Sequence, residues 1–86
     1  MNFQVCLVHY NLALCYQQTN NIKESINNNR ICLEMNKNLE NERNISFQIK
    51  VLYNLAALYE KINRMSEANS YIKQGKLLEK KLENPA

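Results

Sequence analysis

The chain contains little of what tight turns require. Glycine and proline occur once each, at Gly75 and Pro85, and tryptophan and aspartate are absent. Two-residue hairpins and phosphate-binding loops depend on glycine, and many sharp turns use proline. A hairpin-rich β fold and a glycine-loop nucleotide enzyme are therefore disfavoured.

Long apolar runs are missing as well. No run reaches the roughly 18 apolar residues that a membrane helix needs. The N-terminus lacks the basic and apolar regions of a secretory signal. Three cysteines, an odd number, stand at Cys6, Cys15 and Cys32. Without an export signal, we expect a cytoplasmic protein with no membrane partner.

The charge is modest and spread along the chain. Eleven basic and 8 acidic residues give a net charge of +3, and Lys80 and Lys81 form the only adjacent basic pair. Nucleic-acid-binding surfaces usually carry a denser basic stripe. We therefore expect no direct nucleic-acid binding by this segment.

What the chain does have is enough apolar content for a core and an excess of asparagine. Hydrophobic residues make up 45% of the 86 positions, and asparagine occupies 15 of them. This length corresponds to one small domain or to a piece of a larger one.

An internal repeat organises the sequence. Tyr10-Asn11-Leu12-Ala13 returns as Tyr53-Asn54-Leu55-Ala56, 43 residues later, and twelve residues in all are identical at this offset. The chain therefore divides into two copies of one unit, residues 1–43 and 44–86. Two copies are few for a repeat array, so we expect a fragment of a longer one.

Each unit is predicted to contain two helices. Apolar residues recur at helical spacing in the first helix of each copy; they are Val5, Val8, Leu12, Cys15 and Tyr16, then Ile49, Leu52, Leu55, Ala56 and Tyr59. We expect helices over residues 3–18, 22–40, 44–61 and 66–83. Short turns make paired helices antiparallel. The fold class is therefore all-α, with two helix-turn-helix repeats forming a fragment of an α-solenoid.

Asparagine is expected to do the work of glycine at the turns. Asn20 and Asn63 follow the first helix of each copy, and asparagine readily adopts the left-handed conformation that ends a helix. Asn21 is the expected cap of the next helix, with Glu24 as its capping-box partner. Ser66 is the expected cap in the second copy. Residues 39–44 are consistent with either a turn or one continuous helix.

These residues resemble the tetratricopeptide repeat family. Leu12-Ala13, Tyr16, Ser25 and Cys32 match its pattern in the first copy, and Leu55-Ala56, Tyr59, Ala68, Ile72 and Gly75 match it in the second. The chain departs from the family at His9 and Leu52, where tryptophan is common, and at Lys37 and Lys80, where proline is common. The period of 43 also exceeds the family's usual 34.

The long period and residues 47–59 are similar to repeats of PlcR-type quorum-sensing transcription factors of Gram-positive bacteria. This resemblance implies the ligand-sensing part of a peptide-responsive transcriptional regulator. Helix-turn-helix DNA-binding domains accompany such repeats in that family.

A peptide-binding face is predicted on the first helix of each pair, which lines the concave side of such arrays. A carboxamide offers a donor and an acceptor to a peptide backbone, so Asn11 and Asn54 are candidate clamps. Lys50 is placed to attract a carboxylate, and Tyr10 and Tyr53 to supply flat walls. The alternative is that each asparagine bonds only to a neighbouring helix or to water. Asn27, Asn28 and Asn29 are expected to form a solvated face.

Catalysis, metal binding and cofactors are not expected. The cysteine spacings fit no zinc pattern, and Cys15 and Cys32 fall at packing positions. His9 and Cys6 lack the orienting group that a nucleophilic pair needs.

Two functions remain open. One is a peptide- or protein-binding module. The other is a structural, oligomerisation or adaptor module with no small peptide ligand. In either case a homo-oligomer through exposed repeat ends is expected.

Overall fold

A computed structural model of the chain describes residues 3–36 and 42–83, and these residues form four α-helices and no strand. The helices are α1 (Phe3–Gln18), α2 (Ile22–Asn36), α3 (Glu42–Lys61) and α4 (Met65–Glu83). The expected all-α class and the two antiparallel helix pairs are confirmed. None of the described helices is both long enough and apolar enough to cross a membrane.

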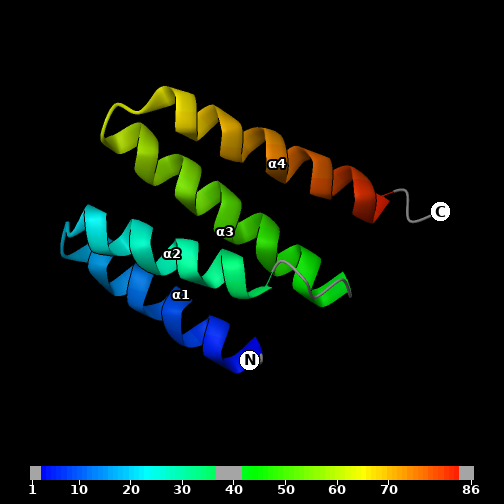
Figure 1. Cartoon of the computed structure of the whole chain (residues 1–86), viewed down its shortest axis with the longest axis horizontal. Helices are drawn as coiled ribbons and strands as arrows, with labels where there is room; N and C mark the ends of the chain where they lie inside the picture. Colours follow the sequence, from blue (N-terminus) through cyan, green and yellow to red (C-terminus); the bar gives the residue numbers. More distant parts are fainter. Residues whose placement is uncertain (1–2, 37–41, 84–86) are drawn as a thin grey trace.

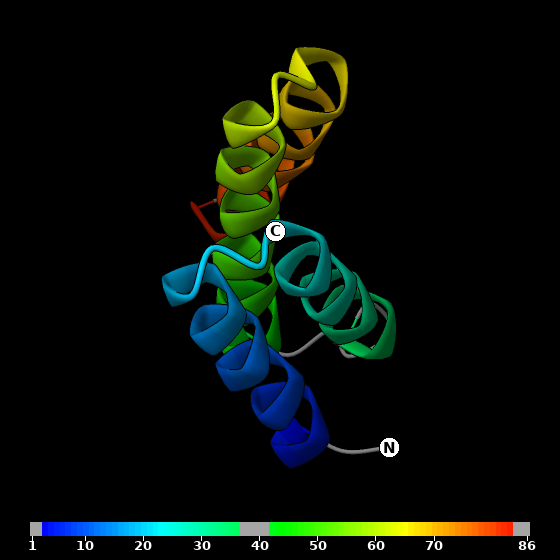
Figure 2. The ribbon, with the colours of Figure 1, turned by 90° about the vertical axis from the view of Figure 1, so that its left-hand side faces the viewer.

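The four helices lie side by side in chain order (Figure 1). Seen end-on, α1 and α2 lie on opposite sides of the molecule, and α4 begins on the side of α2 and crosses behind α3 (Figure 2). The chain measures 41 × 28 × 16 Å along its principal axes. It is therefore a slab two helices thick, in which α3 packs against both α2 and α4.

Asparagine ends the first helix of each pair, as the repeat predicts. Asn20 and Asn63 have φ values of 64° and 61°. In the first turn the amides of Asn20 and Asn21 donate to the carbonyls of Gln17 and Tyr16 at 3.1 and 2.8 Å. Asn63 and Arg64 donate to Glu60 and Tyr59 at 3.0 and 2.8 Å in the second. Both turns are therefore Schellman motifs with asparagine in the position that glycine usually takes.

The caps of the second helices differ from each other. The carbonyl of Asn21 accepts the first helical bond of α2, from Ser25, so the predicted cap position is confirmed. Its side-chain amide donates to Thr19 Oγ1 at 2.9 Å. The predicted cap Ser66 is wrong. Arg64 occupies the cap position, because its carbonyl accepts from Ala68 and α4 begins at Met65.

The chain reverses direction between the two pairs. Asn36, the last residue of α2, donates from Nδ2 to the Asn44 carbonyl at 2.9 Å. Gln48 Nε2 in turn donates to the Asn36 carbonyl at 2.9 Å. A single continuous helix is thereby excluded, and Asn44 lies inside α3. Residues 37–41, where α2 was expected to end, lie outside the described residues.

Small residues permit close approach of the helices where the repeat pattern places them. Ser25 is fully buried and donates from Oγ to the Ala13 carbonyl at 2.7 Å. Ala68 and Cys32 are also fully buried. A Cβ at Gly75 would stand 2.7 Å from Tyr53 Cε1. Glycine there lets the Tyr53 ring lie directly on α4.

The core lies mainly on α3. Val51, Leu55 and Leu58 are completely buried and join Phe47 and Tyr59 in one cluster. Tyr59 stacks on Tyr71 of α4 with ring centroids 5.6 Å apart. The Arg64 guanidinium lies 5.7 Å from the Tyr59 centroid and pairs with Glu67.

Two expectations about burial are wrong. Asn28 and Asn29 are buried rather than solvated, because α2 is covered by α1 and α3. Asn28 Oδ1 accepts from His9 Nδ1 at 2.9 Å, and the Asn28 side-chain Nδ2 donates to the Glu24 carbonyl. Cys15 is exposed rather than packed.

Candidate functional site

One cleft opens between α1 and α3, on the side where the peptide-binding face was predicted. Its volume is about 270 Å³, and it is lined by Leu7, Tyr10, Arg43, Ser46, Phe47 and Lys50. Leu7, Tyr10 and Phe47 supply apolar walls. Arg43 and Lys50 supply two positive charges, and Ser46 adds a hydroxyl.

Tyr10 is fixed in this cleft by contacts to two turns of α3. Its ring meets Phe47 edge to face, with centroids 5.2 Å apart and an interplanar angle of 67°. Asn54 Nδ2 donates to the Tyr10 hydroxyl at 3.2 Å. Edge-to-face packing suits the charge distribution of aromatic rings. The Tyr10 side chain is thus already fixed before a ligand binds, so binding need not order it.

The five residues predicted for peptide binding are only partly brought together. Tyr10 and Lys50 line the same cleft, and Asn54 adjoins it through its bond to Tyr10. That bond is the alternative expected for Asn54, in which the amide joins a neighbouring helix. Asn11 is exposed on α1. It does not belong to the residues that line the cleft.

Tyr53 lies over α4 rather than in the cleft with Tyr10. Its ring covers Gly75, and its hydroxyl donates to a carboxylate oxygen of Glu79. The bond to Glu79 raises the pKa of Tyr53, because the carboxylate favours the protonated phenol. A second, adjoining cleft shares Ser46 with the first and contains Glu79 and Glu83. Positive and negative groups therefore lie on opposite sides of Ser46.

Sequence reasoning missed Arg43 and Ser46 as cleft residues. The signal was present, since residues 43, 46, 47 and 50 follow the i, i+3, i+4, i+7 spacing of one helix face. Arg43 lies outside the expected helix of residues 44–61, because α3 begins at Glu42, whereas Ser46 lies inside it and was not assigned to the binding face.

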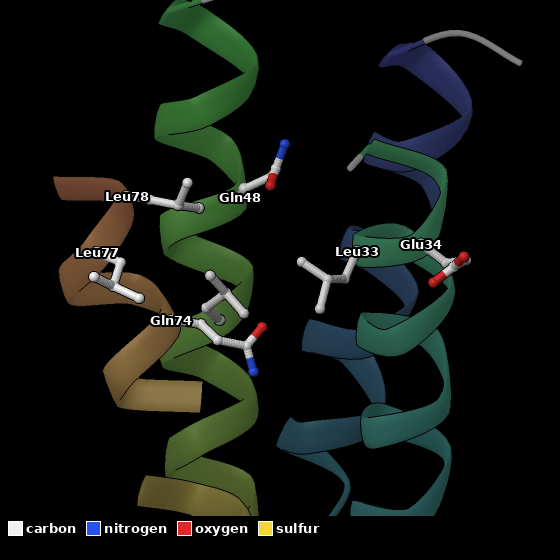
Figure 3. A pocket seen from close by; sticks show the side chains of 7 residues that line it. Leu33, Glu34, Gln48, Gln74, Leu77 and Leu78 are labelled. Atoms are coloured by element: carbon white, nitrogen blue, oxygen red, sulfur yellow. The ribbon is translucent and has the colours of Figure 1, made fainter. Parts of the chain in front are cut away.

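A further cleft of about 420 Å³ opens on the other side of the slab, between α2, α3 and α4. Figure 3 shows Leu33 pointing from α2 toward α3, and Glu34 pointing away from the opening. The remaining lining residues are Gln48, Leu52, Gln74, Leu77 and Leu78. This cleft is walled by leucines, with amide groups at its edge and no cation.

The described residues offer no grouping of catalytic or metal-binding character. Among residues 3–36 and 42–83, no three histidine, cysteine or acidic side chains lie close enough to share a metal ion. Cys32 Sγ donates to the Cys6 carbonyl at 3.0 Å, inside the α1–α2 contact. Burial raises the pKa of Cys32 to about 12, which keeps this thiol protonated at neutral pH.

Comparisons with protein-family models, with curated proteins and with solved structures each found no match to this chain.

Proposed function

We propose that this chain is a non-catalytic helical-repeat module that binds the carboxyl-terminal end of a peptide or protein segment in the α1–α3 cleft. The observation behind the proposal is that Arg43 and Lys50 share one opening with the walls of Tyr10 and Phe47. Two cations beside an apolar surface match a free carboxylate attached to an apolar last residue.

The size of the cleft restricts what it accepts. Sites for whole small molecules usually have volumes of roughly 300 Å³ or more. At about 270 Å³, this open cleft has room for one or two residues of a chain. The rest of the ligand would lie along the outside of α3. Across Ser46, Glu79 and Glu83 offer the opposite charge to a basic group upstream in the ligand.

The roles of the candidate residues follow from this geometry. Lys50 and Arg43 attract the carboxylate, and Tyr10 packs against the last side chain. Asn54 acts indirectly, because its amide fixes the Tyr10 hydroxyl. A charge-assisted hydrogen bond contributes about 1.5–3 kcal/mol. Loss of one such bond corresponds to about a tenfold or greater loss of affinity.

The test is selection of random heptapeptides ending in leucine or phenylalanine on the immobilised 86-residue chain. Selected peptides are then titrated with a free and with an amidated carboxyl end. We expect the free acid to bind at least about tenfold more tightly. Equal affinity of the two forms, or selection of nothing, contradicts the proposal.

A matched pair of variants locates the site. Lys50→Gln should lower affinity for the free acid by about tenfold and leave that for the amide unchanged. Lys73→Gln removes a lysine that is also exposed, from α4 and away from the cleft, and should change neither affinity. Equal losses in the two variants would indicate general charge attraction instead of a site.

The resemblance of residues 47–59 supports an extension of the proposal, namely a cytoplasmic ligand-sensing segment of a bacterial peptide-responsive transcriptional regulator. The free cysteine thiols fit a reducing compartment. A helix-turn-helix segment encoded in frame with these residues would support the extension, and a reading frame confined to them would contradict it. The second candidate, an oligomerisation module, is favoured by the exposed apolar surface of α1.

A further inference from the structure

Helix α1 leaves exposed the residues whose counterparts in α3 form the core. Val8 and Leu12 are 57% and 41% exposed, whereas Val51 and Leu55, 43 residues later, are both 0% exposed. The difference arises because α3 packs against α2 of the first pair as well as against α4, whereas among the residues that the structure describes α1 packs mainly against α2. The same positions are thus buried in one copy and open in the other.

Two more features show that the outer side of α1 is suited to being covered. Cys15 is exposed, and its counterpart Leu58 is completely buried. Helix α1 also contains no charged residue over its 16 positions. We define Val8, Leu12 and Cys15 as the outer face of α1.

The opposite end of the molecule is built differently. In the first pair, Leu7 and Leu33 pack against the core beside α3. Their counterparts in the second pair are Lys50 and Lys76, and both are exposed. Charged residues at these positions give the second pair the polar end that terminal repeats use for solubility. That end is therefore a poor receptor for an apolar helix.

We propose that the outer face of α1 is covered by the same face of a second copy of this chain, in a two-fold symmetric dimer. This inference goes beyond peptide binding and uses the opposite side of α1 from the Tyr10 cleft. A two-fold symmetric contact packs the uncharged outer face of α1 against the identical face of the other copy. Head-to-tail stacking would instead place the apolar face against Lys50 and Lys76.

The dimer is expected to be weak. Helix α1 is about 24 Å long and about 10 Å wide, so one face buries at most a few hundred Å² per copy. A stable interface usually buries about 800 Å² per partner. The assembly should therefore dissociate on dilution from about 1 mM to about 10 μM, where monomer should predominate.

Sedimentation equilibrium over that concentration range tests the proposal. The wild-type chain should convert from monomer to dimer and stop there. Leu12→Glu should remain monomeric at about 1 mM, because the contact would bury two uncompensated carboxylates. Ile62→Glu is the matched control, since Ile62 is also 41% exposed but lies beyond the far end of α3. It should dimerise like the wild type.

A second measurement needs no variant. Alkylation of Cys15 by iodoacetamide should slow several-fold at about 1 mM relative to about 10 μM, as the dimer covers the thiol. The buried Cys6 and Cys32 serve as internal references.

Monomer at every concentration contradicts the proposal and points to another helix pair or another protein as the occupant of the outer face of α1. Open-ended assembly, or equal effects of Leu12→Glu and Ile62→Glu, also contradicts it. Peptide affinity is measured at dilute monomer, so failure of one proposal leaves the other standing.

Discussion

The asparagine residues of this chain have different structural roles, which depend on where each residue lies. Asn20 and Asn63 adopt positive φ and end helices. Asn54 joins α3 to α1 through the Tyr10 hydroxyl. Asn29 is buried and donates to the Ser25 carbonyl within its own helix. Local pattern identifies the first role, whereas the other two depend on which helix lies opposite.

The cysteines provide a prediction at the same scale. Burial raises the pKa of Cys32 from its ordinary value of 9.0 to about 12, and it raises that of Cys6 as well. At pH 8 the Cys32 thiolate should be about a thousandfold rarer than in an ordinary thiol. In dilute native protein, iodoacetamide should therefore modify the exposed Cys15 far faster than Cys32.

The sign of the pH dependence follows from the same shift. Because the folded state favours the protonated Cys32 thiol, the stabilising contribution of this thiol is complete below about pH 9 and is lost as pH rises through about 12.

Peptide mapping by mass spectrometry measures the alkylation rates of the three cysteines, and unfolding in urea should make all three react alike. Similar rates for Cys15 and Cys32 in the native chain would show that α1 and α2 do not enclose the thiol.

At the scale of the element, each helix pair depends on its turn. In both pairs the left-handed asparagine supports two backbone bonds that close the helix end. The second turn adds the contact between Arg64 and the Tyr59 ring. A residue with a Cβ and no local hydrogen-bonding group costs roughly 1–2 kcal/mol in this conformation.

We predict that Asn63→Ala lowers the free energy of unfolding by about 1 kcal/mol, whereas Asn63→Gly leaves it unchanged or raises it slightly. Urea denaturation followed by circular dichroism measures both. Asn69→Ala, on the exposed side of α4, is the control and should not destabilise. Equal stability of Asn63→Ala and Asn63→Gly would show that the left-handed conformation at residue 63 does not affect the free energy of unfolding.

The sequence predicted the pairs of helices but not which of their faces are covered. The repeat at residues 10–13 and 53–56 identified both copies, and spacing identified α1 and its apolar positions. Periodicity cannot say whether a neighbour exists, so Val8, Leu12 and Cys15 were expected in a core and are exposed. Composition likewise suggested solvated asparagines on α2, which α3 covers.

The candidate site shows the same limit. Tyr10 and Lys50 were predicted from the repeat alone, because each lies on the first helix of its pair. Asn11 was included by analogy with Asn54. The analogy fails since Asn54 has a Tyr10 on the preceding pair to bond, and Asn11 has none. The contacts of a side chain therefore depend on whether another helix pair lies beside its own, and not only on its position within the repeat.

At the scale of the whole molecule, a buried polar junction joins the two pairs. The carbonyl of Asn36 is one of the last carbonyls of α2, which have no partner within their helix. Gln48 reaches from α3 to satisfy it, and the Asn36 side chain bonds back to the Asn44 carbonyl. These bonds are buried, so leaving one group unpaired costs about 1–3 kcal/mol. The junction therefore fixes how α3 lies against α2.

We predict that Gln48→Ala lowers the free energy of unfolding by about 1–3 kcal/mol and uncouples the pairs. Gln74→Ala is the matched control, because Gln74 is exposed and bonds only weakly to Ser70 within α4; it should change stability by less than about 0.5 kcal/mol. Hydrogen exchange should show similar protection of the α1–α2 and α3–α4 amides in the wild type. In Gln48→Ala the α1–α2 amides should exchange first, since most of the core lies on α3. If both pairs lost protection equally, the core contacts of α3, and not the Gln48 bond, would hold the pairs together.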